Sequence, residues 1–352
     1  MNQSFWKDKQ VLLTGHTGFK GGWLSLWLQS MGAKVHGYSL APSTHPNFFT
    51  AANVGEDMAS NTIADIRDAQ KIKDVIEQIK PEIIFHMAAQ PLVRHSYAEP
   101  VETYAVNVMG TVNLLEAVRH SASVKAVVNI TTDKCYENRE WSLAYKEEQA
   151  LGGYDPYSSS KACSELVTAA YRQSFLAEKG IGVATARAGN VIGGGDWSND
   201  RLIPDFFRAI AKSQPLIIRS PNAIRPWQHV LEPLGGYLNL AEKLYDDPAK
   251  FAGAWNFGPS EEDAQTVSWI LTKLAEKIPN ATWSIDQNPQ LHEANLLKLD
   301  SSKARGQLNW TPRWSLDEAL NKIVEWQDQF DRGGDLKKYS MSQIVDYVGA
   351  EQ

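Results

Sequence analysis

Cysteine is scarce in this sequence: only Cys135 and Cys163 occur among 352 residues. Two cysteines are too few for a disulfide scaffold, and their spacing is not that of metal ligands, so we expect reduced thiols and no bound metal. Long apolar runs are also missing, and none approaches the ~20 residues that a membrane-spanning helix needs. Lys7 and Lys9 are not followed by the apolar core of a signal peptide, because a glycine-rich turn comes within a few residues. We therefore expect a cytoplasmic protein that does not associate with membranes.

Positive charge is not in excess either. The chain has 35 Lys and Arg against 41 Asp and Glu, a formal net charge of -6. This balance argues against a broad nucleic-acid-binding surface. With 43% hydrophobic and 22% charged residues there is no signature of disorder. The length suggests roughly two domains.

Short apolar segments alternate with amphipathic ones over the first part of the chain. The segments with strand length and β-branched content are Val11–Leu13, Val35–Tyr38, Ile83–Phe85, Val127–Ile130 and Val183–Ala186. The helices expected between and after them are Gly22–Met31, Asp68–Ile79, Val101–His120 and Ser158–Leu176. This rhythm predicts an α/β fold with a Rossmann-type, doubly wound parallel sheet.

Beyond Asn190 the alternation ends. The segment Ile203–Ala211, a strand at Leu216–Arg219 and helices near Pro233–Tyr245, Thr266–Lys277 and Ser315–Gln329 predict a smaller α+β lobe. We therefore expect a dinucleotide-binding domain over residues 1–190 and a substrate-binding lobe over residues 191–352. Returns of the chain from the second part to the first domain remain open.

A glycine-rich turn follows the first predicted strand and begins a helix. Its cofactor candidates are Gly15, Thr17, Gly18, Phe19, Lys20 and Gly21. Glycines let the backbone approach a pyrophosphate, whose charge then lies at the helix N-terminus. The Gly-x-x-Gly-x-x-Gly spacing resembles that of the short-chain dehydrogenase/reductase superfamily.

This resemblance implies NAD as cofactor and adds further candidate contacts: Tyr38, Asp65, Ile66, Ala88, Ala89, Gln90 and Asn107. An acid that would hold the ribose is expected about 20 residues after the glycines. The second strand instead ends in Tyr38-Ser39, with neither an acid nor an arginine, so the residues alone leave NAD and NADP open. For Asp65 the alternative is a cap of the helix near Asp68.

Tyr157 and Lys161 lie four residues apart, on one face of a predicted helix. A nearby cation stabilises a phenolate, so we expect Lys161 to lower the pKa of Tyr157 and make it a usable base. With the glycine turn upstream, the pair resembles the extended branch of the superfamily, whose members mostly act on nucleotide sugars.

Thr132, Asp133 and Lys134 follow the fourth predicted strand, at the sheet edge where active-site groups gather. The triplet is similar to that of nucleotide-hexose 4,6-dehydratases, in which elimination of water needs an acid for the C6 hydroxyl and a base for the C5 proton. By this resemblance Thr132 binds the sugar 4-hydroxyl and Asp133 is the acid. Lys134 departs from the commoner glutamate, which leaves the identity of the C5 base open, because a protonated lysine cannot accept a proton.

Longer segments narrow the resemblance. His86–Arg94, Thr132–Tyr136, Arg187–Trp197 and Ile224–Val230 are similar to the corresponding segments of the CDP-glucose 4,6-dehydratases. That family converts CDP-glucose to CDP-4-keto-6-deoxyglucose, with one NAD oxidising and then reducing the sugar. The resemblance implies Asn190, Arg201, Arg219 and Arg225 as substrate contacts, and a homodimer or homotetramer. The alternatives are a nucleotide-sugar 4-epimerase, a dehydratase for another nucleotide, and a non-catalytic NAD-binding protein.

Overall fold

The large sheet of the protein consists of seven parallel strands. We analysed a computed structural model that describes residues 2–279, 281–286 and 296–349. The strands are β1 (Gln10–Thr14), β2 (Lys34–Ser39), β3 (Ser60–Ile63), β4 (Ile83–His86), β5 (Ala126–Ile130), β6 (Gly182–Ala188) and β10 (Gly253–Phe257). Their spatial order is β10-β6-β5-β4-β1-β2-β3, with every neighbouring pair parallel. The predicted Rossmann-type α/β fold is confirmed.

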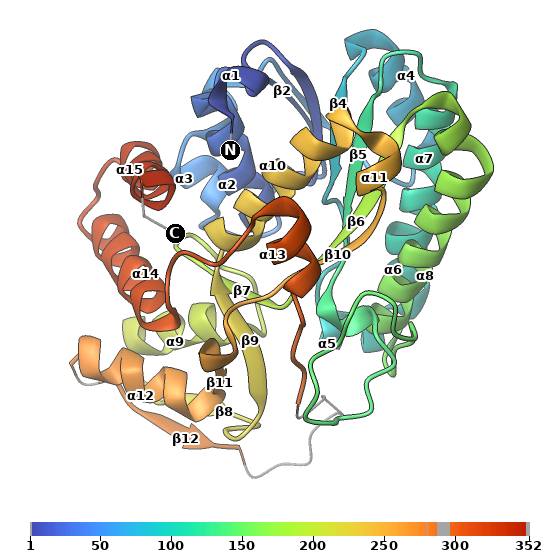
Figure 1. Cartoon of the computed structure of the whole chain (residues 1–352). Coiled ribbons are helices and arrows are strands. Elements are labelled where there is room, and N and C mark those ends of the chain that lie inside the picture. The colour runs from blue at the N-terminus through green and yellow to red at the C-terminus, as the bar shows by residue number, and fades with distance from the viewer. Residues whose placement is uncertain (1, 280, 287–295, 350–352) are drawn as a thin grey trace.

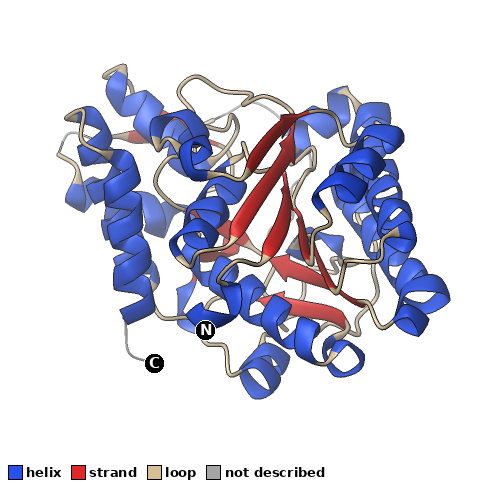
Figure 2. Ribbon diagram, turned by 90° about the horizontal axis from the view of Figure 1, so that it is seen from above, coloured by secondary structure: helices blue, strands red, loops and turns tan. Residues whose placement is uncertain are grey.

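Helices cover both faces of this sheet, as Figure 2 shows. On one face, Val11 and Leu13 pack with α2 (Phe19–Ser30) and α10 (Leu231–Asp246). On the other, the intervening Leu12 packs with α4 (Ala69–Ile79) and α7 (Gly110–His120). Alternate strand residues point to opposite faces, so a strand buried on both faces is a continuous apolar run. This explains why the sequence shows these strands so clearly.

The second half of the chain contributes to the large sheet. Strand β10 pairs with β6, with Gly253 opposite Ala184, and α10 packs against β5 and β6. Figure 1 shows both elements beside strands that precede residue 190. Residues after 190 therefore help to build the same sheet that carries the glycine turn.

The smaller part of the molecule lies at the carboxyl ends of the large sheet (Figure 1). It has a three-stranded sheet of β7 (Asn190–Ile192), β9 (Ile224–His229) and β11 (Ala264–Thr266), and a pair formed by β8 (Leu216–Ile218) and β12 (Trp283–Ile285). The helices α9 (Leu202–Ala211), α12 (Val267–Lys277) and α14 (Leu316–Asp331) contribute apolar side chains to a common core with these strands.

Two long helices, α8 and α15, and several short ones complete the fold. They are α1 (Gln3–Trp6), α3 (Phe48–Ala51), α5 (Val93–Ala98), α6 (Pro100–Tyr104), α8 (Pro156–Tyr171), α11 (Pro248–Phe251), α13 (Ser302–Leu308) and α15 (Leu336–Gly349). The helix predicted over Val101–His120 is interrupted by a π-helical segment, η2 (Ala105–Met109), and a second one, η4 (Arg172–Leu176), follows α8. Such segments are rare and occur often at functional sites.

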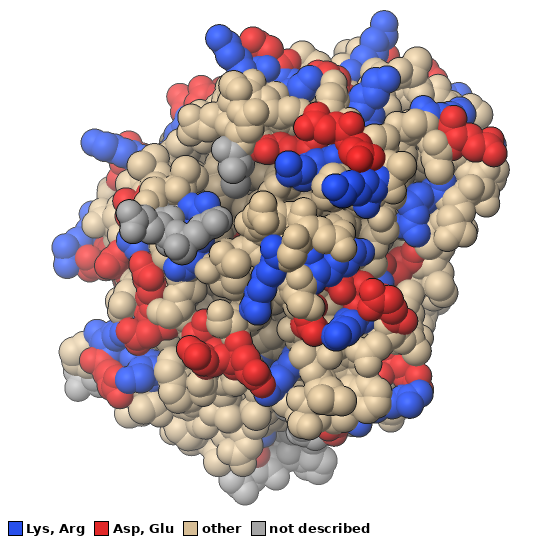
Figure 3. Space-filling view, viewed as in Figure 1, with Lys and Arg blue, Asp and Glu red and all other residues tan. Residues whose placement is uncertain are grey.

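Charged side chains of both signs are interspersed over the face seen in Figure 3, without an extended area of one sign. Within the described ranges, no helix is long and apolar enough to cross a membrane.

Candidate active site

The glycine turn fits the pyrophosphate of a dinucleotide. Gly15 has a φ of +74°, and a Cβ there would lie 2.8 Å from the Ala88 nitrogen. A Cβ on Gly21 would lie 2.1 Å from the Gly15 carbonyl oxygen. Helix α2 begins at Phe19, and its N-cap, Gly18, supplies no side-chain oxygen to the first turn. The backbone is thus closely packed, and the helix N-terminus has no capping side chain in the place where an anion would bind.

Thr17 and the end of β2 form one wall of this turn. The Thr17 hydroxyl bonds with Ser39 Oγ at 2.9 Å and donates to the Leu40 carbonyl at 2.8 Å. Ser39 therefore lies beside the glycine turn, at the strand end where an acid is usual. The sequence analysis did not select it, because a serine does not match the expected acid.

Tyr38 directly precedes Ser39 on β2, and its side chain contacts Asp65. The Tyr38 side chain is buried, and its hydroxyl donates to the Asp65 carbonyl at 2.7 Å. The Asp65 carboxylate binds Arg67 Nε at 2.9 Å, whereas Asp68 caps α4 by accepting from the Lys71 amide. The alternative in which Asp65 caps the helix is therefore wrong.

Neighbouring candidates are mostly engaged within the protein. Ile66 packs closely on Gly110. A Cβ added to Gly110 would lie only 2.7 Å from Ile66 Cγ2. Asn107, in η2, accepts from the Gln90 amide at 2.8 Å and donates to the Gln90 carbonyl and to Ser160 Oγ. These bonds fix the segment Ala88-Ala89-Gln90 after β4 and occupy the Asn107 amide, so Asn107 supports the strand end.

Tyr157 and Lys161 both belong to the first turns of α8, which Asp155 caps by accepting from the Ser158 amide at 2.9 Å. The Lys161 ammonium donates to the Ile130 carbonyl at 3.2 Å, and burial lowers its pKa to about 8. Burial raises the pKa of Tyr157 to about 12, opposed by its side-chain hydrogen bond with Thr132 and by the charge of Arg201. The expectation that Lys161 brings the pKa of Tyr157 below its usual value is not met, because burial outweighs the cations of the chain.

Thr132, Asp133 and Lys134 lie at the carboxyl end of β5, where η3 (Asp133–Cys135) contacts α8. The Thr132 hydroxyl donates to Asp133 Oδ1 at 3.0 Å and accepts from the Lys134 amide at 3.3 Å. Asp133 is 2% exposed, and burial raises the pKa of its carboxyl. Its second oxygen, Oδ2, has no hydrogen-bond partner within the described residues. A carboxyl in this setting favours the protonated form, which can act as an acid.

Lys20 adds a cation to this group. Its ammonium donates to the Tyr237 hydroxyl of α10 at 3.1 Å, and desolvation, reinforced by Arg201 and Lys161, lowers its pKa to about 7. Burial raises the pKa of the Tyr237 phenol. Tyr237 could not be predicted from the sequence, because it lies 217 residues from Lys20 and in no recognisable motif.

The four predicted substrate contacts come from the smaller part of the molecule. Arg201 binds Asp196 at 3.0 Å, and its charge acts on both Tyr157 and Lys20. Arg225 is buried on β9, donates to the Ile224 carbonyl and helps to counter the raised pKa of Asp133. Asn190 begins β7, opposite Trp227 of β9. Arg219 directly follows β8, so it stands on the other small sheet.

The part of the chain that the structure describes contains no group of three or more His, Cys, Asp or Glu side chains that could hold a metal ion.

The fold and the site define an enzyme class of the short-chain dehydrogenase/reductase type: a dinucleotide turn, a tyrosine and lysine on one helix, and a buried carboxyl beside them. The chain belongs to the family described as GDP-mannose 4,6 dehydratase, whose pattern matches residues 12–323. It is 54% identical to the CDP-glucose 4,6-dehydratase of Salmonella typhimurium, over 99% of both chains.

Solved structures share the fold. A UDP-glucose 4-epimerase from Thermotoga maritima, determined with UDP-glucose, superimposes with a TM-score of 0.78 at 21% identity, covering 91% of this chain and 99% of the other. A dTDP-glucose 4,6-dehydratase from Bacillus anthracis, in complex with NAD, gives a TM-score of 0.75 at 21% identity, covering 93% and 98%.

Proposed function

We propose that this protein is an NAD-dependent hydro-lyase that converts CDP-glucose to CDP-4-keto-6-deoxyglucose and water. The observation that carries the proposal is the buried Asp133 carboxyl, hydrogen-bonded to Thr132 beside Tyr157 and favouring its protonated form. A 4-epimerization needs no acid for a C6 hydroxyl, whereas a dehydration does. The 54% identity to a CDP-glucose 4,6-dehydratase over 99% of the chain supports the same reaction and nucleotide.

NAD is the cofactor that the glycine turn would hold. We propose that Gly15, Gly18 and Gly21 receive the pyrophosphate, and that Thr17 and Ser39 face the adenosine ribose. Bound NAD would supply the acceptor for the hydride from sugar C4 and, once reduced, the donor of a hydride to C6, and its positive charge would favour the phenolate of Tyr157. Because no arginine ends β2 to pair with a 2′-phosphate, cofactor-free protein should bind NAD more tightly than NADP in a titration. Tighter binding of NADP would contradict this assignment.

Tyr157 is the proposed base for the sugar 4-hydroxyl. Its pKa of about 12 makes the phenolate scarce at neutral pH, so further positive charge is needed to populate it. Arg201 and the cation pair Lys161 and Lys20 surround this part of the site. We propose that Thr132, which hydrogen-bonds Tyr157, binds the same sugar oxygen.

In this proposal Asp133 is the acid and Lys134 the base of the elimination of water. Protonated Asp133 gives its proton to the departing C6 hydroxyl, which leaves as water. Lys134 is the proposed base that removes the C5 proton, which the C4 ketone has made acidic, and returns it when C6 is reduced. Arg201, Arg219 and Arg225, with Asn190, would bind the nucleotide diphosphate and base.

The test is incubation of the purified protein and NAD with CDP-, dTDP-, UDP- and GDP-glucose, with the products analysed by mass spectrometry. We expect a loss of 18 Da with CDP-glucose at a kcat/KM well above that of the other three. A comparable kcat/KM on dTDP-glucose would reject the nucleotide assignment. Conversion to a C4 epimer would reject dehydration, and no product from any sugar would favour a non-catalytic NAD-binding protein.

We also propose that the protein forms a homodimer through α6, η2 and α8. Val101, Met109 and Leu166 are 81%, 52% and 59% exposed on these elements, which contact one another and lie side by side in Figure 1. Exposed apolar side chains gathered on adjacent helices are typical of subunit interfaces. In sedimentation velocity, Leu166→Glu should shift the protein toward monomer. The equally exposed Val345 of α15 gives the control Val345→Glu, which should not. Monomeric wild-type protein would refute the proposal.

A further inference from the structure

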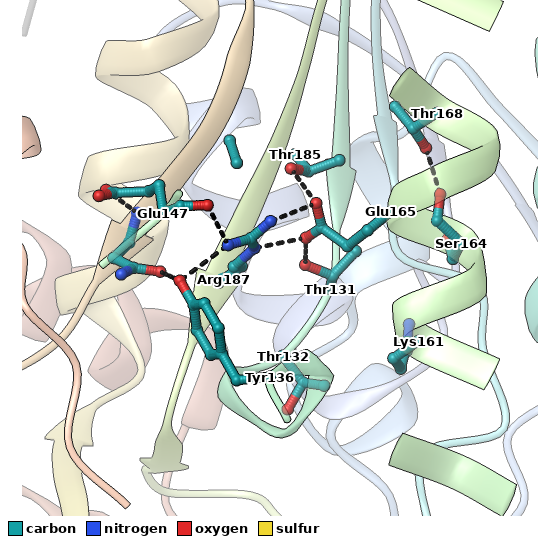
Figure 4. A network of polar contacts seen from close by, with 12 residues as sticks. Thr131, Thr132, Tyr136, Glu147, Lys161, Ser164, Glu165, Thr168, Thr185 and Arg187 are labelled. Carbon is teal, nitrogen blue, oxygen red and sulfur yellow. Dashed lines mark hydrogen bonds and ion pairs between the residues drawn. The ribbon is translucent and has the colours of Figure 1, made fainter. Parts of the chain in front are cut away.

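A buried ion pair lies one helical turn beyond Lys161. Glu165 of α8 and Arg187 of β6 are 4% and 3% exposed, and Arg187 Nε and Nη2 lie 2.8 Å and 2.9 Å from the two carboxylate oxygens. Figure 4 shows the guanidinium in the centre of the network, with Glu165 and Lys161 on the same helix. Neither residue has a role in the proposed chemistry.

Each carboxylate oxygen of Glu165 accepts two hydrogen bonds. Oε1 accepts from the Thr131 hydroxyl as well as from Arg187, and Oε2 accepts from the Thr185 hydroxyl at 2.6 Å. Thr131 directly precedes the turn that carries Thr132, Asp133 and Lys134. Glu165 therefore attaches the beginning of this turn to the helix that carries Tyr157.

Arg187 holds the other end of the same turn. Its Nη1 donates to the Tyr136 hydroxyl at 2.7 Å, and the Tyr136 hydroxyl donates to Asn256 Oδ1 of β10 at 2.8 Å. Tyr136 follows η3 directly and is 1% exposed. One ion pair thus binds the residues on both sides of the catalytic turn (Figure 4).

A fully hydrogen-bonded buried pair fixes geometry better than it adds stability. Burying two charges costs free energy that apolar residues would not, whereas a complete polar network specifies one arrangement. We propose that Glu165 and Arg187 are positioning residues, which hold Asp133 and Lys134 at the right distance from Tyr157 and Lys161. The charge of Glu165 also opposes the effect of burial on the pKa of Lys161. This inference rests on the proposed dehydration.

Three substitutions test it: Thr131→Val, Tyr136→Phe and Glu165→Gln. The first two remove one hydroxyl each and leave the ion pair in place. A misplacement of about 1 Å can cost on the order of 10²-fold in rate, so we expect kcat to fall roughly 10- to 100-fold with KM changed less. Because Tyr157 stays on its helix, the first hydride transfer should persist, and the steady-state fraction of bound NADH should rise.

Glu165→Gln should show the same NADH accumulation and one further effect. Without the nearby carboxylate the pKa of Lys161 falls, so the alkaline limb of the kcat/KM profile should move to lower pH. Thr131→Val and Tyr136→Phe keep that charge and should not move the limb. If Glu165→Gln does not fold, these two variants decide the question.

The control is Glu242→Gln. Glu242 is a buried carboxylate that binds Trp6 Nε1 at 2.7 Å, far along the chain from the turn. It should leave both kcat and the NADH fraction unchanged. Variants of the network that lower only Tm, with wild-type kcat and NADH fraction per folded enzyme, would overturn the proposal.

Hydrogen exchange separates a failure of this inference from a failure of the proposed function. In the variants, amides of residues 131–136 should exchange at least about tenfold faster, while those of α8 and β6 change less. This measurement needs no turnover, so it decides the inference even if wild-type protein does not convert CDP-glucose. Unchanged exchange in this segment would refute the positioning role, whereas a uniform increase would indicate a general structural role.

Discussion

Replacing Asp133 by asparagine separates the two halves of the proposed reaction. Asparagine has nearly the same shape and can still accept the Thr132 hydroxyl, which lies 3.0 Å from Asp133 Oδ1. It cannot give a proton to the C6 hydroxyl. Oxidation at C4 depends on Tyr157 and should continue, so the variant should stop with NADH bound.

The expected size of the effect follows from the role. A positioned general acid is typically worth about 10²- to 10⁴-fold, which corresponds to about 2.7–5.4 kcal/mol of activation free energy. The protein should stay folded, because burial raises the pKa of Asp133 above its value of 3.8 in an unfolded chain. A carboxyl whose pKa is raised by folding destabilises the native state once the pH rises above 3.8, because the unfolded chain releases the proton more readily. At neutral pH the Tm of Asp133→Asn should therefore not fall below that of wild type.

A single-turnover experiment tests whether the reaction stops after oxidation at C4, and a thermal melt tests the stability. Enzyme, NAD and CDP-glucose are mixed, NADH absorbance is followed, and the sugar is recovered for mass analysis. We expect one burst of NADH, no loss of water from the sugar and a Tm no lower than that of wild type. Multiple turnover at near the wild-type rate would show that Asp133 is not the acid, and absence of both NADH and folded protein would contradict the stability argument.

Three further predictions use the same preparation. Tyr157→Phe should bind NAD like wild type but lose at least about 10²-fold in kcat; retention of more than about a tenth would reject its role as base. Lys134→Met should stop before dehydration and lose solvent-deuterium exchange at C5. Persistent exchange would show that Lys134 is not the C5 base and only holds Asp133 or the substrate by its charge. Burial raises the pKa of Glu232 to about 7, so its carboxyl lowers stability as the pH rises from about 5 to 7. Chemical denaturation of Glu232→Gln should show a flatter dependence over this interval, and equal slopes would refute it.

Local sequence carries much of the fold and of the site. Val127–Ile130 predicts β5 (Ala126–Ile130) because a strand buried on both faces must be apolar throughout. β10 was not predicted, because Gly253 and Asn256 interrupt the apolar residues of a short segment. Its place beside β6 follows from tertiary pairing, which no local pattern encodes.

The chemistry of the site depends on burial and on distant residues, which spacing cannot supply. Tyr157 and Lys161 are one turn apart in any helix, so the sequence indicated their proximity correctly. It could not weigh that proximity against desolvation, which in the structure raises the pKa of Tyr157 to about 12. Tyr237 and Glu165 were not predicted as site residues for a related reason: their partners, Lys20 and Arg187, belong to other elements of the fold. A buried tyrosine becomes a base only when positive charge accumulates around it, and Arg201, which comes from a separate segment of the chain and lowers the pKa of Tyr157, supplies part of that charge.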